Sequence, residues 1–435
     1  MPSIIINEID LTAGNPVLSA SDIVYVPGLV TNAAGKFNAD TVLDQNVPTL
    51  ITNIAEFEAA CGTEPYKFST AQNYPVNFSA NAVPNSQVMF GADDPDPAYI
   101  YARELVNLGI PVVYERLNDK TSVATIATVY AALAGDIWTK LVDKTEYQFK
   151  YITSGGYPTF EYGADADTPG NIIAAKMYTL AETRGDAVAL IDHTNNPERI
   201  MTASAQSSVY YAITNVSSAY KISNEYATMF TPWCSYTEPS SGYAIDMPGS
   251  YGYLISLAKS LVNGNDNWLS IAGVKRGVVP NIVLPKTYTP LTKSIAESYQ
   301  PKQGICINAI ANIKPYGYTI WGNRTLLTVG LEGTVAKNFL STRNILSDIK
   351  KVIYTSALRF MFEQNSEVLK LNFKSAISPT LDKMVTGNGL NSWSIKYLET
   401  SDKVKLAAIV KVSPIYAVED FEISVVINND GVEVG

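Results

Sequence analysis

The chain has 435 residues, more than one ordinary hydrophobic core organises, so two or three domains are expected. Apolar residues make up 46% of the sequence and charged residues 17%, which is ample material for folded cores. The net charge of −9 argues against a nucleic-acid partner, because an acidic chain gains nothing from a phosphate backbone.

The first predicted element is a strand over residues 2–12 that is apolar on both faces. Alternation puts Ile5, Ile9 and Leu11 on one face and Ile4 and Ile6 on the other. Such a strand needs a sheet to join, either at the edge of its own domain or on another copy of the chain.

The next elements are shorter. Residues 23–31 predict a strand broken by Pro27-Gly28, and residues 48–62 predict an amphipathic helix that Thr52 or Asn53 caps. Residues 63–98 are rich in Asn, Pro, Ser and Tyr and predict either a long surface loop or a small inserted β unit.

From about residue 99 helices and strands alternate, which predicts a mostly parallel α/β sheet. The expected helices are 99–109, 123–135, 171–183, 198–213 and 249–262. The expected strands are 110–117, 147–156, 186–193, 226–236 and 268–273.

After residue 305 the order changes to an α+β unit. Strands are expected at 305–313 and 318–323, then a long helix at 340–363 with Ile345, Ile349, Val352, Ile353 and Phe360 on one face. A strand at 367–373, a helix at 375–386 and strands at 392–398, 403–412 and 420–428 follow. The last strand alternates Phe421, Ile423, Val425 and Ile427 with polar residues, so it would bury one face and offer its edge.

The charge distribution supports this division. Residues 1–305 contain 18 basic and 29 acidic residues, a balance of −11, and residues 306–435 contain 14 and 12, a balance of +2. We therefore predict an N-terminal arm at 1–22, an outer α/β domain at 23–305, an inner α+β domain at 306–419 and a C-terminal arm at 420–435.

Catalytic chemistry has one candidate, His193, the only histidine, which follows Asp192 at a predicted strand end. A cytosolic α/β hydrolase or transferase acting near His193 is therefore one alternative, although no G-x-S-x-G motif accompanies it. A non-contractile capsid or tube subunit is another alternative.

Metal, cofactor and membrane signals are weak. Cys61, Cys234 and Cys306 are far apart and predict buried free thiols, so we expect no metal and no cofactor. The segment 93–97 (DDPDP) is best explained as a proline-stiffened turn, Ser154-Gly155-Gly156 as a packed turn, and Gly185 as a helix C-cap. The N-terminus lacks a signal-peptide pattern, and no apolar run reaches the length of a membrane span.

Several segments together resemble the contractile tail sheath family of bacteriophages and related injection devices. These are VPGLVTNAAG with NVPTLITNIAEFEAACG, YARELVNLGIPVVYERL, ITSGGYPT with MYTLAETRGDAVALID, NWLSIAGVKRG, INAIANIKPYGYTIWGNRTL, and the closing FEQNSEVLKLNF and KVSPIYAVEDFEISVVIN. They cover most of the chain in the family's order. One departure is that the family's paired arginines at the start of the long C-terminal helix are reduced here to Thr342-Arg343.

The resemblance implies a non-enzymatic subunit that polymerises in stacked six-membered rings around an inner tail tube and contracts to drive the tube through a cell envelope. Its implied partners are itself, the tube protein, and baseplate and tail terminator proteins. Its implied location is a virion tail, assembled in the host bacterial cytoplasm. Terminal arms would add strands to neighbouring subunits. Lys350, Lys351 and Arg359 are the tube-facing candidates. The alternative for Lys350-Lys351 is a solvated helix face.

Overall fold

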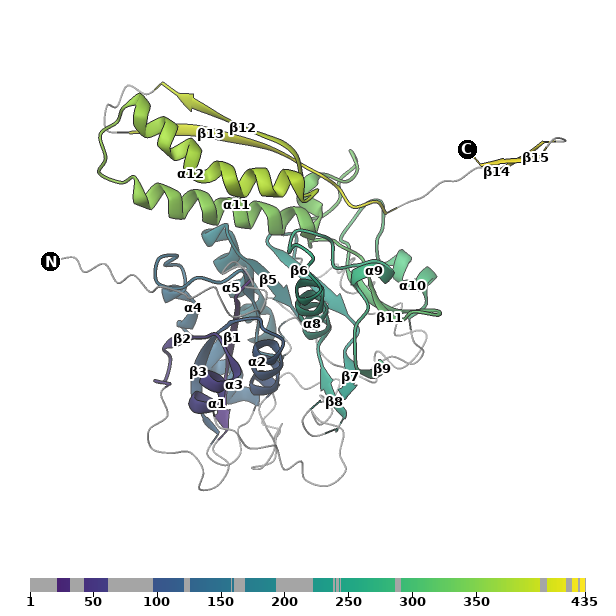
Figure 1. Cartoon of the computed structure of the whole chain (residues 1–435). Coiled ribbons are helices and arrows are strands. Elements are labelled where there is room, and N and C mark those ends of the chain that lie inside the picture. The colour runs from purple at the N-terminus through teal and green to yellow at the C-terminus, as the bar shows by residue number, and fades with distance from the viewer. Residues whose placement is uncertain are drawn as a thin grey trace.

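The computed structural model describes residues 22–31, 43–61, 97–120, 126–157, 159, 169–192, 222–237, 239, 242, 244–285, 291–399, 405–419, 425–428 and 431–434. These residues form two parts, an α/β domain and a smaller C-terminal module that lies across one end of it (Figure 1). No described helix is both long and apolar enough to cross a membrane.

The α/β domain is organised around an eight-stranded sheet in the order β11-β10-β6-β5-β4-β1-β3-β2. The six central strands run parallel, and β2 and β11 are antiparallel edge strands. Their bounds are β1 Val24–Thr31, β2 Pro48–Ile51, β3 Val112–Lys120, β4 Tyr151–Ile152, β5 Val188–Ile191, β6 Ala227–Thr231, β10 Asn308–Ile313 and β11 Gly317–Trp321. Every residue of β5 is buried, as expected for a central strand covered on both faces. The predicted mostly parallel sheet is confirmed.

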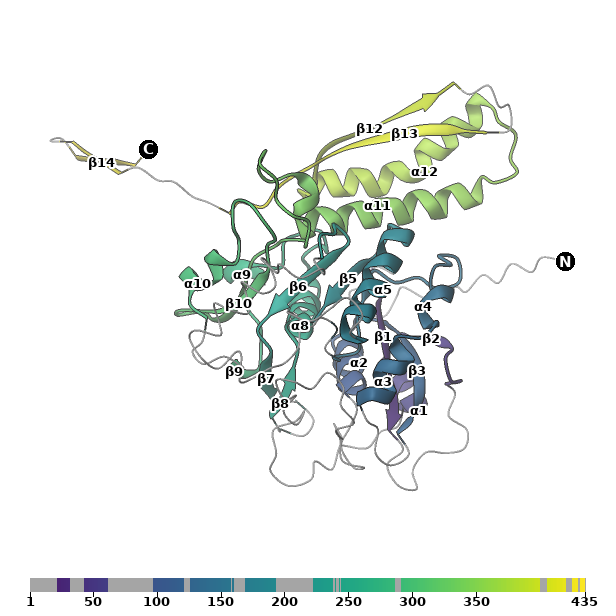
Figure 2. The same cartoon turned by 180° about the vertical axis from the view of Figure 1, so that it is seen from behind.

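Helices cover both faces of this sheet (Figures 1 and 2). They are α1 Ile54–Cys61, α2 Pro97–Asn107, α3 Ile126–Leu133, α4 Ile137–Lys140, α5 Pro169–Arg184, α8 Gly249–Val262, α9 Gly273–Arg276 and α10 Lys293–Ser298. A small antiparallel sheet, β8-β7-β9, extends the domain, with bounds β7 Cys234–Thr237, β8 Ala244–Met247 and β9 Ile282–Pro285. Helix α8 is buried nearly all round and approaches β6 closely, because a Cβ on Gly249 would lie 2.7 Å from the Phe230 backbone.

The C-terminal module consists of two long antiparallel helices and a two-stranded sheet. The 3-10 turn η1 Ala336–Asn338 leads into α11 Leu340–Arg359, which is followed by α12 Glu367–Thr386, β12 Leu390–Leu398 and β13 Ala407–Pro414. Its core contains Ile345, Ile349 and the buried face of α12, and Val352, Ile353 and Phe360 pack against it. The predicted apolar face of the long helix is therefore confirmed.

A separate hairpin of β14 Val425–Asn428 and β15 Gly431–Val434 stands away from both parts (Figures 1 and 2).

The predicted domain boundary at residue 306 is wrong. β10 pairs parallel with β6, and β11 pairs with β10, so both strands complete the large sheet. The charge change near residue 305 therefore does not mark a boundary, and the C-terminal module begins with α11.

Three local predictions are also wrong. Residues 367–386 form one helix, because the buried positions continue at helical spacing through Leu369, Phe373, Ile377, Leu381 and Met384, which outweighs the short alternation at 367–373. Residues 268–273 form no strand and lead into α9. Residues 48–51 are a strand, and the helix that follows is capped by Asn53, whose Oδ1 accepts a hydrogen bond from Glu56 N at 2.9 Å.

Candidate functional site

The residues suggested by catalytic motifs form no reaction centre in the described part of the chain. His193 lies outside the described residues, and the neighbouring Asp192 is fully buried and accepts a hydrogen bond from Ser250 Oγ at 2.8 Å. Burial raises the pKa of the Asp192 carboxyl to about 7. Ser250 Oγ also lies 3.1 Å from Tyr101 Oη, so the carboxyl belongs to a buried hydrogen-bonded group inside the domain.

The cysteines, glycines and acidic residues have structural explanations. All three cysteines are buried and none forms a disulfide, as predicted, and burial raises the pKa of Cys61 to about 12. No group of three or more potential metal ligands occurs among the described residues, and most of 93–97 lies outside them. A Cβ on Gly155 would lie 2.1 Å from Pro27 O, which confirms the packed turn. Gly185 has φ +68° after α5, as predicted for a C-cap.

The most distinctive surface feature is the two-stranded sheet of the C-terminal module. β12 and β13 pair antiparallel, with Trp393 opposite Val412 and Ile395 opposite Val410. Within the described part of the chain, neither strand pairs with a third strand. Each strand therefore has one open edge, where backbone donors and acceptors are available for another strand.

The two faces of this sheet differ in chemistry. Trp393, Ile395 and Val410 belong to the face that packs against the module core. Lys396 and Lys411 are exposed on the opposite face, and Lys396 lies beside Ile409 in the register. The open-edged sheet is thus apolar on its inner face and basic on its outer face.

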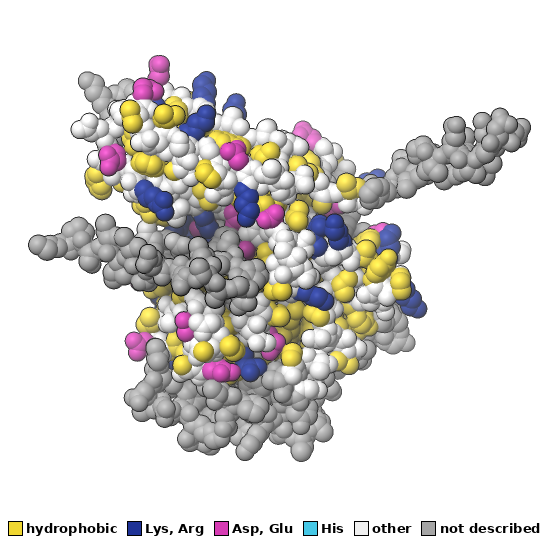
Figure 3. Space-filling view, viewed as in Figure 1, with side chains coloured by type: hydrophobic (Ala, Val, Ile, Leu, Met, Phe, Trp, Pro, Cys, Tyr) yellow, Lys and Arg dark blue, Asp and Glu magenta, His cyan; other side chains and the backbone are white. Residues whose placement is uncertain are grey.

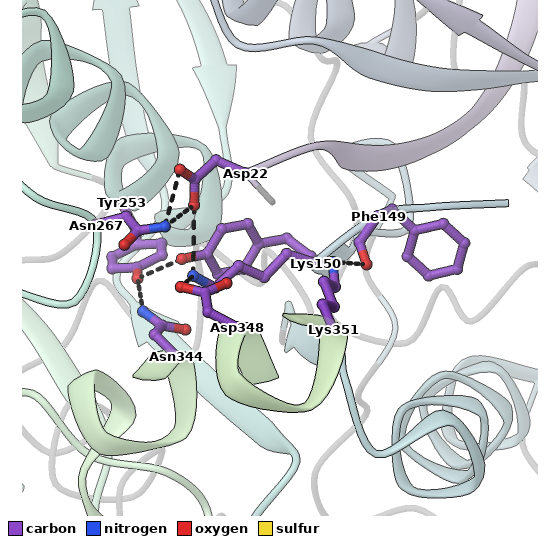
Figure 4. Close-up of polar contacts among 9 residues, drawn as sticks. Asp22, Phe149, Lys150, Tyr253, Asn267, Asn344, Asp348 and Lys351 are labelled. Atoms are coloured by element: carbon purple, nitrogen blue, oxygen red, sulfur yellow. Dashed lines mark hydrogen bonds and ion pairs between the residues drawn. The ribbon is translucent and has the colours of Figure 1, made fainter. Parts of the chain in front are cut away.

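A buried ionic cluster attaches this module to the α/β domain (Figure 4). The Lys150 ammonium group lies 2.9 Å from Asp348 Oδ2 on α11 and 3.4 Å from Asp22 Oδ1 at the entry to β1. Asn267 Nδ2 donates to both Asp22 oxygens, at 2.9 and 3.0 Å. Burial opposes the charge on Lys150, but Asp348 and Asp22 outweigh it and raise the pKa of Lys150. Four segments distant in sequence, which contain Asp22, Lys150, Asn267 and Asp348, are therefore joined at one point.

A tryptophan forms a second attachment. Trp268, from the α/β domain, lies in the core of the C-terminal module and donates a hydrogen bond from Nε1 to Gly387 O at 3.1 Å. A Cβ on Gly387 or Gly389 would lie 2.8 Å from the indole ring. This explains the tryptophan of the NWLSIAGVKRG segment, whose role sequence reasoning did not identify.

Two of the predicted tube-facing lysines point toward the α/β domain. Lys351 Nζ donates to Phe149 O at 2.6 Å, and burial lowers the pKa of Lys351 to about 8. Lys350 Nζ lies 3.1 Å from Tyr226 Oη. The ammonium group of Lys351 is therefore used within the chain, whereas Lys350 is exposed, and the tube-facing role stays a prediction. Arg359 is exposed at the end of α11.

The predicted arm residues are only partly described. Ile4, Ile5, Ile6, Ile9, Leu11, Phe421 and Ile423 lie outside the described residues. Val425 and Ile427 lie in β14, which pairs with β15 in the separate hairpin. Thr342 and Arg343 stand where the tail sheath family has paired arginines. Both residues are buried here, and Arg343 forms an ion pair with Glu225 of the α/β domain.

Comparisons with known proteins find similarity at the level of structure. No protein-family model and no curated protein matches the sequence. The PVC sheath complex of an extracellular contractile injection system, in its contracted state, matches with a TM-score of 0.55 and 14% identity, covering 99% of this chain and 98% of that chain.

Two structures of the anti-feeding prophage also match. Its helical sheath in the contracted state gives a TM-score of 0.56 at 15% identity, covering 97% of this chain and 98% of that chain. Its baseplate in the contracted state gives 0.61 at 12% identity, covering 98% of each chain. The resemblance predicted from sequence is therefore confirmed at the level of the fold, over both the α/β domain and the C-terminal module.

Proposed function

We propose that this chain is a structural subunit of a contractile tail sheath, which polymerises around an inner tube and contracts to drive the tube through a cell envelope. The observation that carries the proposal is the fold likeness over 97–99% of the chain to proteins from a contracted sheath complex and a contracted helical sheath. This role requires no catalysis and no cofactor.

The open-edged sheet supports assembly by strand exchange. A two-stranded sheet is marginal by itself and gains backbone hydrogen bonds from each strand that a neighbour adds. Head-to-tail exchange of this kind generates rings or open helices rather than closed dimers. Residues 1–12 and 420–428 of neighbouring copies are the proposed donors for the two open edges.

Charge complementarity favours the same pairing. Residues 1–12 contain Glu8 and Asp10 but no basic residue, and residues 420–435 contain four acidic residues but no basic residue. Alternation places Asp420 and Glu422 opposite the apolar set of the C-terminal strand. An arm that buries its apolar face against the module core would turn acidic side chains toward Lys396 and Lys411.

The two attachments within the subunit support movement as a near-rigid body. The Lys150 cluster and Trp268 hold the module on the α/β domain, so contraction would act on contacts between copies. Each additional 100 Å² of apolar surface buried per subunit would contribute about 2.5 kcal/mol. The free energy that drives contraction would be stored when the sheath assembles, so contraction requires no nucleotide.

The finer features of the assembly belong to the same proposal. The subunits form stacked six-membered rings in a phage virion tail, after synthesis in the host bacterial cytoplasm. The inner tube, a baseplate and a tail terminator are the proposed partners, and the likeness to a chain from a baseplate structure supports the second of these. Lys350 and Arg359 are retained as tube-facing candidates because both are exposed on the C-terminal module.

Electron microscopy of purified protein tests the proposal. The full chain should form long hollow sheaths, and a variant lacking residues 1–12 should remain folded and fail to polymerise. Replacing residues 1–12 by a Gly/Ser segment of equal length separates loss of the strand from loss of length, and this variant should also fail. A full chain that forms no polymer at any concentration would reject the sheath role.

The hydrolase alternative has its own test. His193→Ala should assemble normally if the chain is a sheath subunit, whereas an enzyme using His193 should lose its activity. No observation on the described residues favours that alternative.

A further inference from the structure

Residues 322–325 follow β11 directly and close the stretch INAIANIKPYGYTIWGNRTL, to which the sections above assign no role. Asn308 on β10 binds both backbone groups of Arg324. Its Oδ1 accepts from Arg324 N at 2.8 Å, and its Nδ2 donates to Arg324 O at 2.9 Å. A Cβ on Gly322 would lie 2.8 Å from Asn308 Oδ1, so this close approach requires glycine. The segment is therefore fixed to the large sheet.

The same segment caps the long helix of the C-terminal module. The residue before α11 is Phe339, whose side chain supplies no capping hydrogen bond. Asn323 acts instead, because its backbone oxygen accepts from Leu340 N at 2.9 Å and its Oδ1 accepts from Ser341 N at 3.2 Å. Two of the first amide groups of α11 thus find acceptors on a residue distant from the helix. The start of α11 is fixed to residues 322–325.

The Arg324 side chain binds the last described residue of the C-terminal module. Its guanidinium group lies 4.5 Å from the centre of the Phe339 ring, donates to Thr334 Oγ1 at 3.2 Å and forms an ion pair with Glu419. The Arg324 side chain is only 10% exposed, whereas that of Glu419 is 35% exposed. A planar guanidinium group can stack on a ring and pair with a carboxylate at the same time, which lysine does less well.

Residues 415–419 are held at two further places. Ile415 N donates to Gly389 O at 3.0 Å, and the ring centres of Tyr416 and Phe339 lie 5.3 Å apart. Phe339 thus contacts both the arginine and the segment that the arginine pairs with. The described chain passes the start of α11 at this point, before the separate β14-β15 hairpin (Figure 1). Basic, acidic and hydrophobic side chains lie close together along the junction between the two parts (Figure 3).

These contacts lie beyond the last element of the module. β13 ends at Pro414, which pairs with Leu390, so the antiparallel sheet is complete before residue 415. Ordering a segment costs conformational entropy, and a connection to a separate hairpin does not require it. Residues 415–419 nevertheless form a backbone hydrogen bond, a ring contact and an ion pair with a nearly buried arginine.

We propose that Arg324 is a positioning residue for the C-terminal arm. It fixes residues 415–419 to the segment that also joins the large sheet to the start of α11, so the chain leaves the subunit from one point and in one direction. The consequence for assembly rests on the proposed function. An arm that starts from a fixed point loses less conformational entropy when it pairs with a neighbouring copy.

Distances between nitroxide labels on the dilute, unassembled full chain test the anchor. Val418→Cys and Tyr316→Cys introduce labels at exposed positions of the held segment and of the turn between β10 and β11. The native cysteines are buried, so they should not react in the folded protein. This pair should give one narrow distance distribution, and Glu419→Gln or Arg324→Met should widen it at least twofold.

A second label pair reports on the module itself. Tyr316→Cys combined with Leu398→Cys, an exposed position on β12, should keep a narrow distribution in both variants, because the two attachments described above hold the module independently. The matched control is Glu332→Gln, which removes the same charge from an exposed turn and should widen neither distribution.

Assembly gives a separate readout. Glu419→Gln should raise the protein concentration at which sheaths form roughly fivefold, the effect of losing a partly exposed ion pair. Glu332→Gln should leave that concentration unchanged.

The outcomes are distinct. An unchanged distribution for the Val418 label pair in both Glu419→Gln and Arg324→Met overturns the inference. Equal widening of both label pairs also overturns it, because Arg324 would then hold the module rather than the exit of the chain. Widening without a change in the assembly concentration would refute the positioning role. Widening of the Val418 pair alone, in a chain that never forms sheaths, would retain the anchor and reject the proposed function.

Discussion

The Nε1 atom of Trp268 donates a hydrogen bond to the carbonyl oxygen of Gly387 at 3.1 Å, across the boundary between the α/β domain and the C-terminal module. The indole also occupies the space in front of Gly389, where a Cβ would lie 2.8 Å from the ring. The domain contact therefore depends on two positions without side chains.

Gly389→Ala should destabilise the protein by about 1–3 kcal/mol, because the added methyl group forces the indole out of a packed core. Gly330→Ala is the matched control, since a Cβ there meets no atom within 4 Å, and it should change stability little. Urea unfolding of both variants measures the difference. Equal stabilities would show that Trp268 accommodates the methyl group.

Lys150→Met should destabilise the protein by about 3–5 kcal/mol, because it leaves the buried Asp22 and Asp348 without their cation. Both carboxylates are almost inaccessible to water. Lys293→Met removes an exposed pair with Glu297 and should cost about 1 kcal/mol or less. Denaturant midpoints of the two variants provide the comparison, and similar losses would contradict the assigned role of burial.

Asp192→Asn should stabilise the protein increasingly as the pH rises from about 4 to about 7. Burial raises the pKa of Asp192 from 3.8 to about 7, so the folded state binds a proton that the unfolded state releases in this window. The contribution of Asp192 to the free energy of unfolding of the wild type is therefore greatest below pH 4. It falls by roughly 4 kcal/mol in total as the pH rises to 7.

The asparagine variant lacks that titration and keeps an acceptor for Ser250 Oγ. The measurement is the difference in unfolding free energy between wild type and variant at several pH values. A difference independent of pH would contradict the raised pKa.

Lys396→Glu combined with Lys411→Glu should reduce polymerisation while leaving the subunit folded, because it places acidic side chains on the sheet face proposed to meet acidic arms. Lys275→Glu combined with Lys302→Glu changes the net charge equally at exposed positions of the α/β domain and should assemble like wild type. Sedimentation of polymer at low and high salt gives the readout. Equal assembly of both double variants would exclude the charge complementarity.

The sequence by itself determined the elements whose pattern is local and repeated. Strand DAVALI and helices such as 249–262 and 340–359 have a hydrophobic period long enough to specify their type, and the α/β alternation specified a mostly parallel sheet. The segments that resemble the tail sheath family, which occur in that family's order, also indicated the sheath-like fold. The prediction of a strand at 367–373 was wrong. A short alternation of apolar residues is compatible with both a strand and a helix, and only the longer spacing through residue 386 indicates the helix.

Only the tertiary structure decided which distant segments meet. Strand β10 joins β6, Trp268 enters the C-terminal module, and Lys351 turns inward to Phe149, because pairing edges, cavities and the direction of a helix face are set by packing across the whole chain. A helical period indicates which residues share a face, but it does not indicate what that face meets. For the same reason, the sequence did not indicate that the first half of α11 is mostly buried while Tyr354 and Leu358 in its second half are exposed.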